Sequence, residues 1–249
     1  MSRFLTCAAV FSFLILNLAT GTSWAWFDET HIAIARAAGY KHWYNAAGAD
    51  IAKVKAGTKE GKNHFFNNDN NEEVSAKTVL AQADRYNRSN DREGHLYGAI
   101  IASLRDFRSA KSAGKFPEYH MAFCVHYIGD LSQPLHNSAH DKFNKAHHAI
   151  NDGIVEEEVL DKISEIQKHM YEIKLRPGHF DEDLAKEIAR IANISHLLGL
   201  KLKGENRNMT NGEAYAELGH SASLLKAVLN GLGDSEKQVS SSRFGEGTR

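Results

Sequence analysis

The sequence is poor in cysteine and in proline. Its 249 residues include two cysteines, Cys7 and Cys124, and three prolines. We expect Cys7 to be removed with an amino-terminal leader, so the folded chain keeps one thiol and cannot close an internal disulfide. Few prolines leave long stretches in which helices can run without interruption. Stability must therefore come from an apolar core or from bound metal rather than from cross-links.

Neither sign of charge is in excess. Lysine and arginine number 30 against 31 aspartates and glutamates, which gives a formal net charge of −1. A general nucleic-acid binder normally has a basic surface, so the composition disfavours that class of protein. Histidine, by contrast, is abundant: the chain has 14, and all of them lie beyond residue 25. Histidine is the commonest protein ligand for transition metals, so the positions of these residues have to be considered.

The amino terminus has the pattern of a leader peptide. Arg3 precedes the apolar run 4–19, and small residues follow up to Ala25. This pattern predicts a signal peptide over residues 1–25, whose cleavage makes Trp26 the first residue. An uncleaved membrane anchor is the alternative, but the run is shorter than the ~20 residues that a membrane-spanning helix needs. We expect a secreted or periplasmic protein.

The rest of the sequence predicts an all-α protein with a single multi-helix domain over residues 26–232. Apolar residues recur with helical spacing, and no convincing alternating strand occurs. The predicted helices cover residues 29–45, 71–88, 93–111, 116–130, 150–171, 181–200 and 211–229. Asp181 and Asn211 are the expected N-caps of the last two. Segments 48–70 and 131–147 are rich in Gly, Asn, Lys and His and predict loops, and the polar segment 233–249 predicts a disordered tail.

Two histidine–aspartate pairs carry the strongest chemical signal. His126 and Asp130 are four residues apart on a predicted helix, and His148 and Asp152 repeat that spacing further on. The spacing places each pair on one helix face, and His136 lies in the loop between them. Imidazole and carboxylate ligands suit zinc. A single pair of this kind is more often a surface ion pair, but two pairs around a loop histidine favour a metal site.

In these motifs, the sequence resembles the zinc-dependent phospholipase C and S1/P1 nuclease family. That family begins its mature chain with a tryptophan that binds zinc through its amino terminus, and Trp26 has this position here. An early helical histidine corresponds to His31. Asp50 precedes His64 by the family's interval of about fourteen residues, and His64 opens a similar aromatic turn.

The remaining family elements are HxxxDxxxxxH, matched by His126, Asp130 and His136, and a closing HxxxD or HxxxE, matched by His148 and Asp152. His147 is the competitor of His148, but it would pair with Asn151, which is a poorer ligand. The ordered set spans residues 26 to about 160. Beyond that point the likeness is only that the chain is helical.

The resemblance implies three zinc ions. One would be held by Asp50, His64, His126 and Asp130, and its close neighbour by Trp26 and His31 with Asp130 bridging. The third would be held by His136, His148 and Asp152. The resemblance further implies that a hydroxide bridging two zincs attacks phosphorus, with Asp50 orienting or deprotonating it as the catalytic residue. Because the α-amine of Trp26 exists only after cleavage, we expect signal-peptide removal to activate the protein as well.

The sequence leaves the substrate open. The turn at His64, the interval from Asp50 and the absence of disulfides resemble phospholipases C. The short interval from Trp26 to His31 and the aspartate at 152 resemble nucleases. We expect a phospholipase C that cleaves the glycerol-side phosphodiester and touches a membrane surface transiently; another phosphodiester is also possible. The alternatives are a single-strand nuclease, which would bind nucleic acid, and a non-catalytic exported zinc-binding protein.

Overall fold

The computed structural model describes residues 26–56 and 58–245; within these, the side chains of 53–59 and 234–245 are not described. Every regular element in the described residues is a helix, as the sequence predicts. The α-helices are α2 (Asp28–Ala37), α3 (Gly48–Ala56), α4 (Thr58–Gly61), α5 (Ala76–Ala83), α6 (Leu96–Ser112), α7 (Glu118–Leu131), α8 (Lys142–Asp152), α9 (Ile163–Lys168), α10 (Phe180–Glu205) and α11 (Asn211–Gly245). Three short 3₁₀ turns are η1 (Trp43–Asn45), η2 (Pro134–Asn137) and η3 (Pro177–His179). The predicted signal peptide, residues 1–25, lies outside the described residues.

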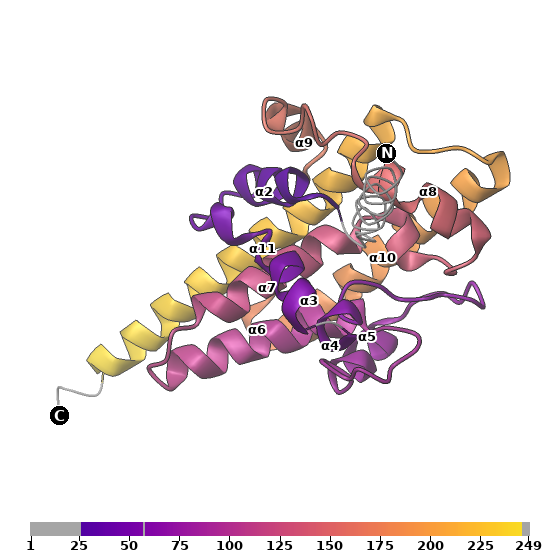
Figure 1. Ribbon diagram of the computed structural model, residues 1–249. Coiled ribbons are helices and arrows are strands. Elements are labelled where there is room, and N and C mark those ends of the chain that lie inside the picture. Colours follow the sequence, from indigo (N-terminus) through magenta and orange to yellow (C-terminus); the bar gives the residue numbers. More distant parts are fainter. Residues whose placement is uncertain (1–25, 57, 246–249) are drawn as a thin grey trace, which may run out of the picture.

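Helix α7 is the centre of the fold. It lies between α6 and α11, and both helices pack against it (Figure 1). The run from Met121 to Leu131 is buried at every position. A helix that is buried all round has no solvent face, so its polar residues point into the protein as well. His126 and Asp130 are therefore interior residues, although their spacing alone would also suit a surface pair.

The long helices α10 and α11 form the scaffold behind the site. The predicted N-cap Asn211 is one residue late, because Thr210 caps the start of α11. The Thr210 Oγ1 accepts a hydrogen bond from the Glu213 backbone N–H, and the Glu213 carboxylate accepts one from the Thr210 backbone N–H. This reciprocal pair is a capping box. Asp181 lies inside the first turn of α10, after the N-cap His179. In the described part of the chain, no helix is both long and apolar enough to span a bilayer.

Helix α11 continues to Gly245, into segment 233–249 for which the composition predicts disorder. No proline follows Pro177, so no proline ring interrupts the helix there.

The two predicted loops are partly helical. Segment 48–70 contains α3 and α4, and segment 131–147 contains η2 and the start of α8. The loop prediction from composition was wrong here because packing overrides weak local preference. Ala49 of α3 is fully buried, and α3 packs on α7. At the start of α8, Asp141 caps the helix by accepting from the Asn144 backbone N–H.

The single helix predicted over 150–171 is also wrong, since α8 ends at Asp152 and turns lead to the short helix α9. Gly153 explains the break. A β-carbon at this position would lie 2.7 Å from the Phe27 ring, so the amino-terminal segment packs directly on the glycine backbone. Phe27 N donates to Asp152 O (3.4 Å), and Glu156 caps α2 by accepting from Glu29 N and Thr30 N. The end of α8 is thus the anchor for the start of the described chain.

Candidate metal centre

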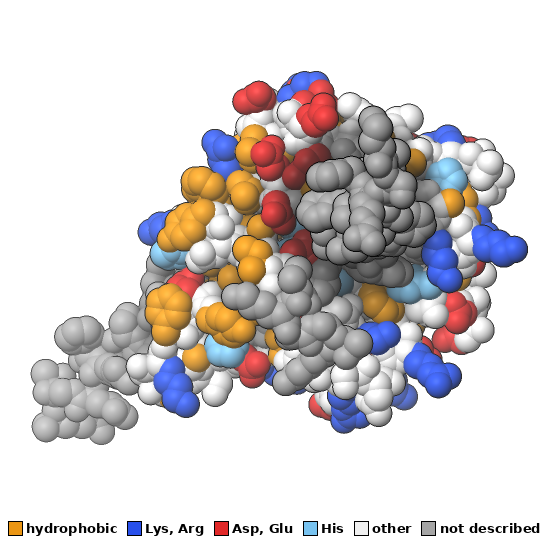
Figure 2. Space-filling model, viewed as in Figure 1, with side chains coloured by type: hydrophobic (Ala, Val, Ile, Leu, Met, Phe, Trp, Pro, Cys, Tyr) orange, Lys and Arg blue, Asp and Glu red, His pale blue; other side chains and the backbone are white. Residues whose placement is uncertain are grey.

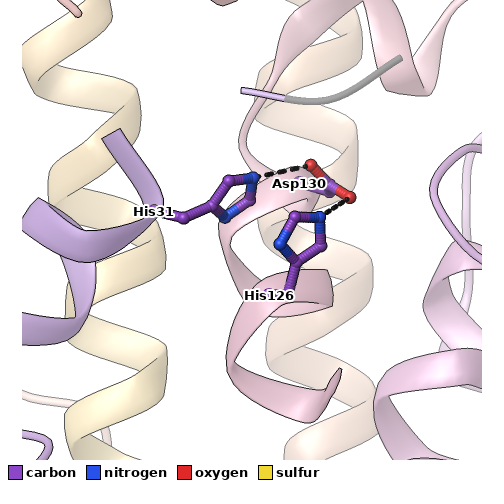
Figure 3. Close-up of side chains that lie close together, drawn as sticks. All are labelled: His31, His126 and Asp130. Atoms are coloured by element: carbon purple, nitrogen blue, oxygen red, sulfur yellow. Dashed lines mark ion pairs between the residues drawn. The ribbon is translucent and has the colours of Figure 1, made fainter. Parts of the chain in front are cut away.

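Helix α7 supplies two side chains to a buried cluster. Nε2 of His126 and Oδ2 of Asp130 are 3.4 Å apart, one helical turn from each other. Helix α2 lies opposite and directs His31 toward the same carboxylate (Figure 3). The distance from His31 Nε2 to Asp130 Oδ1 is 3.4 Å, and the His31 and His126 rings stack with centroids 3.7 Å apart. Two helices distant in sequence therefore meet at Asp130.

Both oxygens of Asp130 are shared among histidines. Oδ1 faces His31 and also His136, whose Nδ1 lies 3.6 Å away. Oδ2 faces His64 Nδ1 at 2.9 Å and His126 Nε2 at 3.4 Å. Asp130 and these four histidines are almost completely buried. A carboxylate with a different set of imidazoles on each oxygen has the geometry needed to bridge two cations.

Asp50 joins this cluster from α3, a helix that the sequence did not predict. Its Oδ1 lies 3.9 Å from His64 Nδ1 and 3.8 Å from His126 Nε2, and the two histidine nitrogens are 3.2 Å apart. The Asp50 side chain keeps 17% of its surface exposed, whereas the His64, His126 and Asp130 side chains keep none. Asp50 is therefore the side chain of this group that solvent or a substrate can reach.

A third group lies at the η2–α8 end of the cluster. His136 Nε2 is 3.9 Å from Asp152 Oδ1, and His148 Nε2 is 3.4 Å from Asp152 Oδ2. The two imidazole rings stack with centroids 4.9 Å apart. Gln133 donates its side-chain amide to Asp152 Oδ1. Because His136 also faces Asp130, this third group is continuous with the other two.

Hydrogen bonds fix which histidine nitrogen faces the cluster. His126 Nδ1 lies 2.8 Å from Ala46 O, and His148 Nδ1 lies 2.7 Å from Asn144 Oδ1. Since each acceptor requires a proton on Nδ1, both rings turn a bare Nε2 inward. This is the usual orientation of histidine ligands, whose outer N–H is held by a carbonyl, amide or carboxylate.

The electrostatics also suit a cation. Burial is the largest effect on His31 and lowers its pKa, so its imidazole is neutral and can act as a ligand. Burial alone would raise the pKa of Asp130, but the imidazoles of His126 and His136 outweigh it and hold the pKa well below its usual range. Asp130 is thus a buried anion.

Three groups of these side chains could hold metal ions, each with ligand atoms within 4.8 Å of one another: His31, His126 and Asp130; Asp50, His64 and His126; His136, His148 and Asp152. Among the described residues, Asp130 Oδ1 and His31 Nε2 are buried and have no hydrogen-bond partner. A buried polar atom without a partner costs about 1–3 kcal/mol, and a cation between these two atoms would remove that cost. The residues present therefore fit a metal site.

Trp26 stands at the start of the described residues, and its side chain is fully buried. The hydrogen bond from Phe27 N to Asp152 O places the adjoining backbone at the third group. Metal binding by the α-amine of Trp26 depends on cleavage of the preceding bond, so that role stays a prediction.

The other histidines lie outside the three groups. His147 turns to Asn208, with Nδ1 2.6 Å from Oδ1, and stacks on Phe143. His140 packs against Phe65, with ring centroids 4.3 Å apart. Sequence reasoning missed the outer partners Ala46, Gln133 and Asn144. Asn144 precedes His148 by one helical turn, and that spacing could have revealed it.

The chain matches no protein-family model, no curated protein and no solved structure. Any functional conclusion therefore rests on the geometry of this site.

Proposed function

We propose that the protein is a metal-dependent phosphoesterase with three zinc ions, and that it cleaves phospholipids in the manner of a phospholipase C. The observation that carries this proposal is the convergence of eight side chains, Asp130 among them, from α2, α3, α7, α8 and the segments between them. Asp50, His64, His126 and Asp130 would hold one ion, and Asp130 would share a second with His31. His136, His148 and Asp152 would hold the third.

Zinc ions bound here would activate water for attack on phosphorus and would stabilise the charge that develops on the phosphate oxygens. The protein residues supply binding and orientation. The stacked pairs His31–His126 and His136–His148 fix the directions of the ligands, and the buried anion Asp130 would hold neighbouring cations together. Asp50, the exposed carboxylate, is placed to orient the attacking water or to accept its proton.

Surface residues near Asp50 support a lipid rather than a nucleic acid as substrate. Trp43 and Tyr44 are 40% and 58% exposed, and Ile51 beside Asp50 is 59% exposed. Ala46 lies between these residues in the sequence, and its carbonyl contacts His126, so this segment adjoins the cluster. Hydrophobic side chains gather over α2 and the turn after it, with acidic side chains beside them (Figure 2). Tryptophan and tyrosine are favoured at the boundary between lipid and water, whereas acidic groups repel a polyanion.

The activity is tested by one assay with three substrates. The mature, zinc-loaded chain is incubated with phosphatidylcholine, with phosphatidylethanolamine and with single-stranded DNA. Release of a phosphorylated head group is the expected result. Cleavage of DNA alone would mean that the protein is a nuclease and not a phospholipase. Zinc binding without cleavage of any of the three substrates would mean that it is a non-catalytic metal-binding protein.

The Asp50→Asn variant tests the catalytic step. An amide keeps the size of the side chain but removes the charge and most of its basicity. We expect zinc to remain bound through the histidines while hydrolysis falls by about a hundredfold or more, within the range of general acid–base catalysis. Undiminished hydrolysis would refute the role of Asp50. The chain with its leader retained is expected to bind less zinc than the chain that begins at Trp26.

A further inference from the structure

His64 differs from the other ligands in the direction that its outer nitrogen faces. Its Nδ1 points into the cluster, toward Asp130, Asp50 and His126. Its Nε2 points away, is buried, and has no hydrogen-bond partner among the described residues. The carboxylate of Glu60, four residues earlier in α4, lies 3.5 Å from that nitrogen. The outer side of His64 thus faces a buried carboxylate that belongs to none of the three groups of candidate ligands.

Glu60 is held in position from two other directions. The Tyr127 hydroxyl donates to Glu60 Oε1 (2.5 Å), and the Asn63 side-chain amide donates to Glu60 Oε2 (3.1 Å). Tyr127 lies on α7 directly after the ligand His126, so one helix supplies both the cluster and the clamp on Glu60. The Glu60 side chain is 7% exposed, and its orientation is therefore set by the protein rather than by solvent.

A second layer fixes Asn63. Its Oδ1 lies 2.8 Å from His95 Nε2, and His95 Nδ1 lies 2.9 Å from Asp91 Oδ2. Asp91 in turn pairs with Arg85 at 3.2 Å. A chain of polar contacts therefore runs from the surface arginine to Glu60. Such a series of contacts would not be needed if Glu60 were only a residue at the end of a short helix.

We propose that Glu60 is a positioning residue for the metal centre: when metal is bound, its carboxylate would accept a hydrogen bond from the Nε2–H of His64 and thereby present Nδ1 as the ligand atom. The inference rests on the proposed function, since it assumes that the group of Asp50, His64 and His126 binds metal. Carboxylate–histidine–metal triads of this kind raise the basicity of the ligand and fix its ring. The role is one that neither the motif spacing nor the family resemblance assigns.

The test uses the mature chain and its Glu60→Gln variant, which keeps the shape of the side chain and removes its charge. Zinc is titrated against a competing chelator while the His64 and His126 ring signals are followed by NMR. Loss of an outer carboxylate costs about 10–100-fold in metal affinity, and that is the fall expected for this group. Glu73→Gln, an exposed glutamate on the same stretch of chain, is the matched control and should bind zinc as the parent does.

Two further measurements separate positioning from simple stability. The metal-free Glu60→Gln variant should melt within a few degrees of the parent, and Tyr127→Phe, which removes one clamp on Glu60, should show a smaller loss of affinity. In the zinc-loaded parent, nitrogen NMR should show the His64 proton on Nε2.

Several results would overturn the inference: unchanged zinc affinity in Glu60→Gln, a proton on Nδ1 of His64 in the zinc-loaded parent, or an equal loss of stability with and without zinc. Zinc binding by the parent without hydrolysis of any phosphodiester would refute the proposed activity and would leave the role of Glu60 standing. Failure of the parent to bind zinc would refute both.

Discussion

Asp130 and Glu217 are both buried carboxylates, and they behave in opposite ways. Asp130 is fully buried at the metal centre, and the imidazoles around it hold its pKa well below the usual range. Glu217 is 4% exposed on α11, where burial raises its pKa to about 8 although a contact with Ser195 lowers it. Burial is common to both residues, so the neighbours decide the charge. The protein places an anion where a cation can bind and a neutral acid where its scaffold helices pack.

The Asp130→Asn substitution should have the largest effect, because it removes the buried anion that distinguishes Asp130 from Glu217. The amide keeps the shape of the side chain but removes the charge that His31, His64, His126 and His136 surround. We expect the zinc content to fall and the stabilisation by excess zinc to disappear, which is about 4 kcal/mol when zinc exceeds its dissociation constant a thousandfold. Elemental analysis and thermal unfolding with and without zinc measure both effects.

Asp84→Asn, at an exposed position after α5, is the matched control for the loss of one aspartate charge. It should leave zinc content and unfolding unchanged. An Asp130→Asn protein that retains its full complement of zinc would show that the carboxylate is not shared between ions.

Glu217→Gln tests the other buried carboxylate. Because the folded-state pKa of about 8 lies above the ordinary value of 4.5, the native state favours the protonated form. Its contribution to stability is complete below pH 4.5 and is lost as the pH rises toward 8. Glutamine stays neutral, so the variant should be more stable than the parent near pH 8, by about 2–3 kcal/mol if half of the shift is realised, and equal to it near pH 4.5.

Urea unfolding of the parent and of the Glu217→Gln variant across this pH range measures the difference in free energy. The exposed Glu73→Gln variant should follow the parent at every pH. A Glu217→Gln difference that does not change with pH would mean that Glu217 is ionised in the folded protein, and the contrast with Asp130 would be lost.

The two sides of the metal centre differ in how far the sequence predicted them. His126 and Asp130 share a long apolar helix, where spacing determines geometry, so the sequence predicted their juxtaposition. Asp50 and Glu60 lie on the short helices α3 and α4, which form because they pack on the rest of the protein and not because local propensity requires them. Glu60 precedes His64 by four residues, yet in a segment that composition predicts as loop this spacing carries no meaning.

The helix α8 shows the same limit. The pair His148 and Asp152 was predicted from its spacing, although the helix was expected to start later and to continue to residue 171. The helix ends where Gly153 meets the Phe27 ring, a contact between segments more than a hundred residues apart. Contacts of this kind depend on the finished fold, so a reading of local pattern does not reveal them. Spacing within one helix thus predicted ligands, and only packing between helices shows their partners.

The smallest and most local test is Gly129→Ala on α7. A β-carbon at this position would meet Nδ1 of His31 and lie 2.7 Å from its Cε1, so the ring would have to move. Overpacking of a buried contact costs about 1–3 kcal/mol. Because His31 faces Asp130 from this direction, we expect zinc affinity at that group to fall while the group of His136, His148 and Asp152 still binds.

Gly48→Ala is the matched control, since a β-carbon at the start of α3 would have no neighbour within 4 Å. This variant should bind zinc normally and be slightly more stable, by about 0.4–1 kcal/mol, because alanine loses less backbone entropy on folding than glycine. Zinc titration and thermal unfolding of the two variants side by side distinguish the outcomes. Equal zinc affinity in the Gly129→Ala and Gly48→Ala variants would mean that the His31 ring can turn away from residue 129 without leaving the metal centre. The contacts with His64, His126 and His136 would then be enough to keep Asp130 ionised.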